Sequence, residues 1–190
     1  MSTADTILLR CAGRATQEQW KQVQGLAAEV GARRARGYGN TEETYAYFDF
    51  AAPQELKADA VSALELKVSA KLGGARVSGV ALKKVSERKG VSTGFPAPIH
   101  YVVEMDFPPE AAAELTKWYE EEHLVGLGSV EGCVRTSRFM SAAGRSFACY
   151  DLGSNIVPEK PEWQKWRDTE WTRRVREHHR NMKRGIYAAL

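Results

Sequence analysis

The sequence predicts an α+β fold built from two ferredoxin-like halves, each with the element order β-α-β-β-α-β, whose sheets pack against each other. Two observations and one general rule of packing predict this fold. Strand and helix patterns follow the same order twice along 190 residues, a length that suits one average domain or two small ones. A connector rich in Gly and Pro, residues 88–98, separates the two runs. A ferredoxin-like unit has helices on one sheet face only, so two such units can cover each other's bare faces.

The first half is expected to contain four strands and two helices. Its first helix has a clear start, because Thr16 and Gln19 have the spacing of a capping box. Pro53 is expected to open the second helix in its first turn, and Gly73-Gly74 to end it. The expected strands are 7–12, 31–38, 45–50 and 77–85, and the expected helices are 17–30 and 53–72.

The second half repeats this order. From Ile99 to Phe107, apolar residues alternate with a mixed set, which is typical of a strand with one buried face. Pro108-Pro109 and Pro161 are each expected to open a helix. The expected strands are 99–107, 132–140, 145–152 and 184–189, and the expected helices are 108–124 and 161–179. A break near residues 90–97 gives an N-terminal half, 1–90, and a C-terminal half, 91–190.

The composition is that of an ordinary globular protein. Hydrophobic residues make up 43% and charged residues 27%, with a net charge of +3, so neither disorder nor a nucleic-acid or membrane partner is indicated. No stretch approaches the roughly 20 apolar residues that span a bilayer, and the segment from Met1 to Arg14 resembles no targeting signal. Cys11, Cys133 and Cys149 lack zinc-ligand spacing and are interpreted as reduced core thiols. We therefore expect a cytoplasmic protein without a metal site.

One segment of the second half carries a family signature. The stretch Trp118-Tyr-Glu-Glu-Glu-His-Leu124, followed by Val130-Glu-Gly-Cys-Val-Arg-Thr-Ser-Arg-Phe139, resembles the EthD-like branch of the dimeric α+β barrel superfamily. Its pattern is W-Y-x-x-E-H, a short loop, V-x-G, and a strand that ends in R-[YF]. The usual proline after the E-H pair is absent, and Val125 stands near its place.

The resemblance implies an intrachain version of the dimeric α+β barrel, formed by tandem duplication. It also implies a small enzyme without a dissociable cofactor. Such enzymes act on oxygenated aromatic, polyketide or ring-cleavage compounds as isomerases, lyases, cyclases, hydrolases or monooxygenases, and a minority handle haem. We therefore expect no cofactor, a small-molecule substrate, and a monomer or homodimer.

Comparison of the two halves locates the expected site. The segment Gly31 to Tyr38 matches Gly132 to Phe139 in length, first glycine and last aromatic, and Arg34 falls on Arg135. The Glu-His segment has no counterpart in the first half, where Gln22-Val-Gln-Gly25 stands instead. We therefore expect one working site, in the second half, with the first half as scaffold.

His123 and Tyr119 are the predicted catalytic residues. Their i, i+4 spacing places them on one helix face, and a histidine can accept and return a proton near neutral pH. Tyr119 would hydrogen-bond His123 or donate to a developing oxyanion. Glu122, the family match, would orient the site. A structural alternative is that His123 interacts with the helix dipole at a C-terminus.

The predicted substrate-binding residues are two arginines and three aromatics. Arg135 and Arg138 lie three apart on one strand and point to opposite faces, so one would hold a substrate anion and the other an ion pair; the residues alone do not decide which. Flat aromatic side chains would form a wall for a planar substrate. These are Trp118, Tyr101 and Trp163.

Other readings remain open. His100 would lie on the strand face away from the helices, and His178-His179 near a helix end, so their participation is undecided. Glu120 and His123 have the spacing of a di-iron ligand pair, but the motif occurs once where two are needed. RNA-recognition motifs share the βαββαβ order, but Arg36-Gly-Tyr-Gly39 continues into a polar, acidic turn instead of a strand.

The expected function is therefore that of a cofactor-independent enzyme. It would use general acid–base chemistry on a small oxygenated anion from aromatic catabolism or ring cleavage, as an isomerase, lyase or ester hydrolase. The sequence lacks a Gly-x-Ser-x-Gly nucleophile elbow, so hydrolysis would need another route. The alternatives are a non-catalytic binding or scaffold protein of the same fold, an RNA-recognition-like module, or a haem-handling protein.

Overall fold

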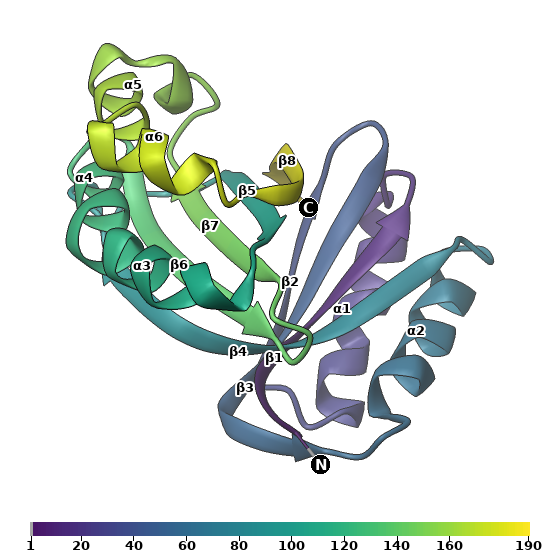
Figure 1. The fold of residues 1–190 in the computed structure, drawn as a ribbon. Helices are drawn as coiled ribbons and strands as arrows, with labels where there is room; N and C mark the ends of the chain where they lie inside the picture. Colours follow the sequence, from purple (N-terminus) through teal and green to yellow (C-terminus); the bar gives the residue numbers. More distant parts are fainter. Residues whose placement is uncertain (1) are drawn as a thin grey trace. The chain divides into compact units, whose positions relative to one another are not determined.

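The computed structural model describes residues 2–190, so the first residue of the N-terminal segment, Met1, lies outside it. The chain forms two compact units. Unit 1 runs as far as Lys84 and takes in Tyr187–Leu190, and unit 2 is Val85–Ile186. In each unit the helices cover one face of the unit's own strands (Figure 1). No helix within residues 2–190 has the length and apolar character needed to cross a bilayer.

Unit 1 has the predicted βαββαβ order. Its elements are β1 (Ser2–Ala12), α1 (Gln17–Glu29), β2 (Arg34–Gly39), β3 (Glu43–Leu56), α2 (Ala60–Lys71) and β4 (Val77–Lys89). Strand β1 pairs antiparallel with β3 and β4, and β3 pairs with β2. The predicted capping box is confirmed, because the side chains of Thr16 and Gln19 each accept a hydrogen bond from the other's backbone N–H.

Unit 2 repeats the order with broken helices. Its strands are β5 (Ile99–Asp106), β6 (Cys133–Ser141), β7 (Ser146–Leu152) and β8 (Arg180–Ala189). Between β5 and β6 come a 3₁₀ turn (Pro109–Ala111), α3 (Ala112–Trp118), a π-helical turn (Tyr119–His123) and α4 (Leu124–Gly128). Between β7 and β8 come a second 3₁₀ turn (Val157–Glu159), α5 (Pro161–Arg167) and α6 (Glu170–Arg176).

In unit 2, β5 pairs antiparallel with β7, and β7 pairs antiparallel with β6. Together with the doubled βαββαβ order, this confirms the predicted fold class, a tandem ferredoxin-like α+β fold.

Two predicted helix boundaries are wrong. Pro53 does not open a helix; it lies in the extended strand β3, at the irregularity in the β1–β3 register between the Ala4 and Thr6 pairings. A bulge tolerates a residue without a backbone N–H. The predicted helix 161–179 is interrupted, because Asp168 leaves the helical conformation and Thr169 caps a new helix through its side chain. That helix ends at Arg176, and β8 starts at Arg180.

Gly37 of β2 sets how closely α1 approaches its sheet. A Cβ atom at this position would lie 2.5–2.7 Å from three ring atoms of Trp20, which is buried in the core of unit 1. The absence of a side chain therefore lets the indole ring lie directly on the strand backbone.

We expect Gly37→Ala to lower the free energy of unfolding by about 1–3 kcal/mol, because the Trp20 ring must shift in a packed core. Gly25→Ala is the matched control. A Cβ at Gly25, inside α1, meets nothing within 4 Å, so the same substitution should stabilise the helix by about 0.5–1 kcal/mol. Urea unfolding of both variants measures the difference, and equal midpoints would contradict the packing argument.

Candidate functional site

A pocket lies within unit 2, between its helices and its strands. It encloses about 490 Å³ with its open mouth included, of which about 50 Å³ admits the centre of a water molecule. It is therefore a narrow slot in this structure. Its lining is mainly aromatic and apolar at one end and cationic at the other. The lining residues are Tyr101, Val103, Met105, Trp118, Tyr119, His123, Leu127, Tyr150, Trp163, Arg167, Thr172, Arg176, His179, Met182 and Arg184.

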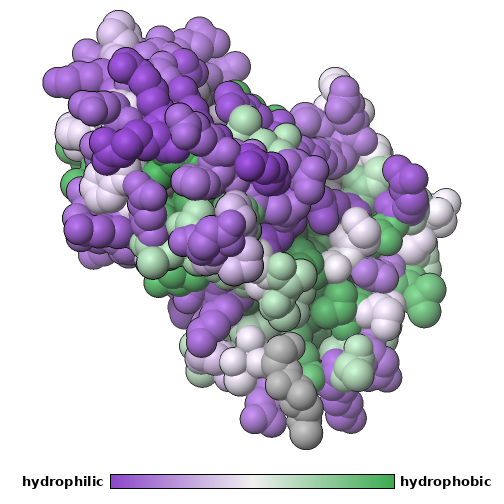
Figure 2. Space-filling view, viewed as in Figure 1, coloured by the Kyte–Doolittle hydropathy of each residue, from purple (hydrophilic) through white to green (hydrophobic). Residues whose placement is uncertain are grey.

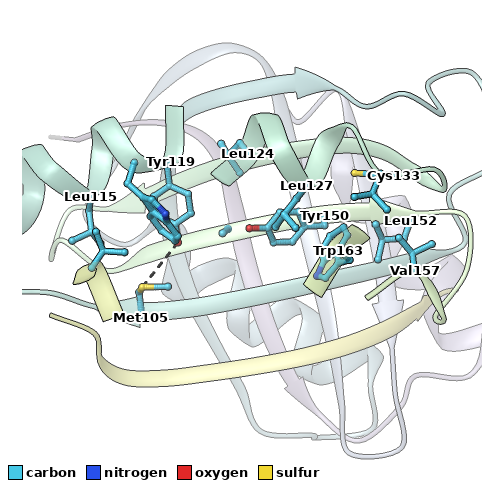
Figure 3. Packing of buried hydrophobic residues seen from close by; sticks show 14 of the residues in the cluster. Met105, Leu115, Tyr119, Leu124, Leu127, Cys133, Tyr150, Leu152, Val157 and Trp163 are labelled. Carbon is cyan, nitrogen blue, oxygen red and sulfur yellow. Dashed lines mark hydrogen bonds between the residues drawn. The ribbon is translucent and has the colours of Figure 1, made fainter. Parts of the chain in front are cut away.

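Aromatic side chains form the walls of the pocket. The rings of Tyr150 and Trp163 lie 5.3 Å apart edge to face, and Tyr101 lies 5.7 Å from Tyr150 and 6.3 Å from Trp163. Figure 3 shows Tyr150 and Trp163 among the core side chains between the helices and the strands of unit 2. The predicted aromatic wall of Tyr101, Trp118 and Trp163 thus lies around one cavity, with Tyr150 added to it.

A π-helical turn places His123 against Trp118. In an α-helix, residues five apart point in different directions, but the i→i+5 hydrogen bonds of a π-turn bring them into line. The rings of Trp118 and His123 are accordingly stacked, with centroids 4.1 Å apart and planes 26° apart. Tyr119 contacts the same imidazole edge to face at 5.7 Å. Turns of this kind are frequent at functional sites, and this one spans the predicted catalytic residues.

His123 is a neutral imidazole inside the protein. Its side chain lines the pocket, and the residue is only 8% exposed. Burial, followed by the positive charge of Arg176 and the neighbouring His179, lowers the pKa of His123 to about 3, opposed by a hydrogen bond with the Trp166 backbone. Its Nδ1 atom has no hydrogen-bond partner among residues 2–190. The ring is therefore a neutral imidazole at neutral pH, and its buried Nδ1 has a lone pair that no described residue uses.

Tyr119 is held as a neutral phenol. Its hydroxyl lies 4.0 Å from the Met105 sulfur (Figure 3), and the guanidinium of Arg138 lies 4.6 Å from its ring centre. Burial raises the pKa of Tyr119 to about 12, although the Arg138 cation opposes the rise. At neutral pH Tyr119 can therefore act as a hydrogen-bond donor and not as a base.

The two predicted arginines do not line the pocket. Arg138 is 1% exposed and donates hydrogen bonds to Ser146 and Thr116 while its guanidinium supports the Tyr119 ring. Arg135 pairs instead with the carboxylate of Asp151, on the other side of the strand. The strand alternation predicted from the sequence is therefore present, but neither face presents an arginine to the cavity.

The other predicted polar residues have identifiable contacts. Glu122 is half-buried outside the pocket and accepts a hydrogen bond of 2.5 Å from the Thr169 hydroxyl. Glu120 pairs with Arg88. The buried His100 ring bonds Asp151 at 2.7 Å, on the opposite side of the strands from the pocket. No group of three or more metal-ligating side chains occurs among residues 2–190.

Three arginines that line the pocket were not among the predicted site residues: Arg167, Arg176 and Arg184. His179, whose participation the sequence left undecided, lines the pocket as well. The rings of Trp118 and His179 lie 6.2 Å apart. Burial and then Arg176 and Arg184 lower the pKa of His179 to about 4, and its Nε2 atom has no partner among the described residues. Arg176 and Arg184 stand in a basic stretch of the sequence whose composition is typical of a solvated helix face, so no local signal places them at a pocket.

A chain of hydrogen bonds fixes the π-turn to the start of α6. Thr169 caps α6 by accepting from the Thr172 backbone N–H at 3.0 Å, and it donates to Glu122. The Trp118 indole N–H donates to the Thr172 hydroxyl at 3.1 Å. These bonds therefore let α6, the helix that carries Arg176, fix the position of the Trp118 indole on which His123 is stacked.

Thr169→Ala is expected to lower the free energy of unfolding by about 1–2 kcal/mol, because α6 loses its N-cap and Glu122 loses its donor. Thr169→Ser keeps both hydrogen bonds and is the control. Thermal unfolding followed by near-UV circular dichroism compares the variants, since the signal reports the packing of Trp118. A melting temperature for Thr169→Ala equal to that of Thr169→Ser would contradict the structural role.

Comparisons with known proteins support the fold. No family model matches the chain, and no curated protein matches it in sequence. The chain is similar to the solved structure of an anthrone oxidase-like protein, with 12% sequence identity, a TM-score of 0.62, and coverage of 97% of this chain and 90% of that one. It is also similar to a ferredoxin-fold protein from Listeria monocytogenes related to antibiotic biosynthesis monooxygenases, with 11% identity, a TM-score of 0.60, and coverage of 98% of this chain and 95% of that one. A third similar structure is a haem-degrading enzyme from Listeria monocytogenes, with 9% identity, a TM-score of 0.57, and coverage of 96% of this chain and 98% of that one. At these identities the chain shares their ferredoxin-like, dimeric α+β barrel type of fold.

Proposed function

We propose that this chain is an enzyme that acts by general acid–base catalysis on a small, oxygenated, aromatic anion. The observation that carries the proposal is the placement of a buried, neutral His123 on the wall of an aromatic pocket with arginines at its other end. The EthD-like signature over residues 118–139 supports the same reading. The name of one structural neighbour, an anthrone oxidase-like protein, supports an oxygenated aromatic substrate.

In the proposed reaction His123 accepts a proton from an acidic carbon or hydroxyl of the substrate and returns it at another position or to a leaving group. Tyr119 donates a hydrogen bond to the oxygen on which negative charge develops. Isomerisation and elimination fit these two roles. Ester hydrolysis fits them when His123 takes the proton from a water molecule that attacks the ester carbonyl and then gives it to the leaving alcohol. All of the catalytic groups come from the chain itself, so the proposed reaction requires no dissociable cofactor.

The experiment is a turnover screen of oxygenated aromatic acids and ring-cleavage products with the wild-type chain and His123→Ala. The proposal expects at least one acid to be converted by the wild type and far more slowly by the variant. Equal conversion by both proteins, or no conversion of any acid in the panel, would contradict it and favour a non-catalytic binding or regulatory role for the fold.

Haem handling is a second candidate. His123 and His179 each have an unpartnered ring nitrogen at a pocket that also holds three arginines, and carboxylates such as haem propionates pair with arginine. The narrow slot argues for a smaller ligand. Titration with hemin distinguishes the two: a stoichiometric Soret shift that is lost in His123→Ala and His179→Ala would favour haem.

A further inference from the structure

We infer that the pocket binds its ligand through a carboxylate, that Arg184 of β8 is the primary anchor of that carboxylate with Arg176 beside it, and that the ligand is a planar aromatic acid. This inference rests on the proposed function for the substrate's ring system, but it concerns binding and not turnover. It replaces the two arginines that the sequence suggested with two that line the cavity.

The charge of the pocket lining favours an anionic ligand. Three arginines line it, and none of the lining residues carries a carboxylate. Arg167 and Arg176 both pair with Asp168 outside the pocket lining, at 3.1 and 2.7 Å. Arg184 has no carboxylate partner within residues 2–190, and its guanidinium contacts the Met182 sulfur at 3.4 Å. Of the three guanidinium groups, that of Arg184 is the one free to pair with a ligand.

The positive charges converge on the cavity. Burial raises the pKa of Tyr101, and Arg184 and Arg167 oppose that rise. Arg176 and Arg184 also lower the pKa of His179, and Arg176 lowers that of His123. The three arginines line the same pocket as this tyrosine and these histidines, and the electrostatic effects agree with that placement. A carboxylate among them would be attracted by more than one cation.

The shape of the pocket selects an aromatic acid over other anions. Trp163 and Tyr150 are buried at the apolar end, whereas Arg176 and Arg184 are exposed at the mouth. Figure 2 shows that the surface over α5 and α6 is strongly hydrophilic, in contrast to the aromatic interior. A ligand with a flat ring at one end and a carboxylate at the other fits both ends. Inorganic phosphate or an aliphatic acid leaves the aromatic walls without a partner.

Binding would also prepare the catalytic base. Burial is the largest cause of the lowered pKa of both histidines, and the Arg176 charge adds to it, so a carboxylate beside Arg176 would offset the smaller contribution and raise those pKa values in part. A general base works best when its pKa is near the working pH. The anion would therefore bring His123 closer to that condition at the moment the substrate is in place.

The test is isothermal titration calorimetry of the full chain with 2-naphthoate, 2-naphthamide and acetate. We expect the wild type to bind the naphthoate and to bind the neutral amide and acetate much more weakly. Arg184→Gln should weaken naphthoate binding roughly 10- to 100-fold, as expected for loss of a charge-assisted hydrogen bond, and should leave amide binding unchanged. Arg173→Gln is the matched control, because Arg173 is an exposed arginine of α6 that does not line the pocket.

Three results would overturn the inference: no naphthoate binding by the wild type, equal binding of naphthoate and amide, or equal weakening by Arg184→Gln and Arg173→Gln. The outcome is separable from that of the proposed function. Normal naphthoate binding by Arg184→Gln alongside lost turnover in His123→Ala would contradict only the anchor. Weakened binding by Arg184→Gln alongside unchanged turnover in His123→Ala would contradict only the acid–base mechanism.

Discussion

Replacing His123 by alanine is expected to lower kcat on the protein's substrate by on the order of 10²- to 10⁴-fold, the usual effect of removing one general acid–base group. The physical reason is the position of the imidazole. It is stacked on Trp118, lines the pocket and has a ring nitrogen without a partner in residues 2–190. His179 also lines the pocket with an unpartnered ring nitrogen, but its ring lies 6.2 Å from that of Trp118, against 4.1 Å for His123.

The controls separate chemistry from folding. His178→Ala removes a histidine of the same unit that does not line the pocket, so its kcat should equal that of the wild type. His123→Asn fills more of the space than alanine and guards against collapse of the site. If His123→Asn is folded by near-UV circular dichroism and turns over substrate at the wild-type rate, the assignment of His123 is wrong.

Acid should destabilise the protein, and His123 should account for much of the loss. The pKa of His123 is about 3 in the folded chain against an ordinary value of 6.5. The unfolded chain therefore binds a proton between these two values that the folded chain does not. Stability that His123 contributes is fully present above pH 6.5 and is lost as the pH falls toward 3, up to roughly 5 kcal/mol.

Urea unfolding of the wild type and His123→Gln between pH 7 and pH 3.5 measures this contribution. Glutamine does not titrate, so the free energy of unfolding should fall less steeply for the variant, even if it starts lower at pH 7. His179, whose pKa is also lowered, to about 4, adds to the slope in both proteins. Parallel curves for the two proteins would show that His123 titrates normally and is not buried as described.

Much of the fold follows from the sequence because its signals are local. The capping box at Thr16 and Gln19 and the alternation along β5 each depend on a few neighbouring residues. The doubled order could be predicted because it repeats these local signals. The prediction that Pro53 opens a helix was wrong because the pairing of β3 with β1 on both sides of Pro53 outweighs the preference of proline for a helix start. Pro53 is therefore part of a strand.

The site could be predicted only in part. Tyr119, His123 and the aromatic wall were found through a compact motif and the presence of large rings. The π-turn could not be predicted, because no distinctive residue marks it in the sequence. The turn changes the direction in which the following side chains point, so that His123 stacks on Trp118 and not on the predicted partner Tyr119. Arg184 and His179 reach the pocket from β8 and from the end of α6, a placement that depends on the tertiary structure.

Comparison of the units explains why the two predicted arginines do not line the pocket. Arg34 pairs with Asp49 in unit 1 as Arg135 pairs with Asp151 in unit 2, so this shared residue serves the fold. Where unit 1 has Gly37 under the Trp20 ring, the matching position in unit 2 holds Arg138 under the Tyr119 ring. Arg138 thus occupies the space that a direct helix–strand contact fills in unit 1, and it supports the site from behind.

The most direct test of the central claim is a crystal structure of the wild-type chain with the tightest-binding aromatic acid of the calorimetric panel. We predict that the ring lies among Tyr101, Tyr150 and Trp163, that its carboxylate is within hydrogen-bond distance of Arg184 or Arg176, and that the nearest imidazole is that of His123. A ligand found outside this pocket, or one bound here with its carboxylate turned away from both arginines and its reactive atoms remote from His123, would contradict the account.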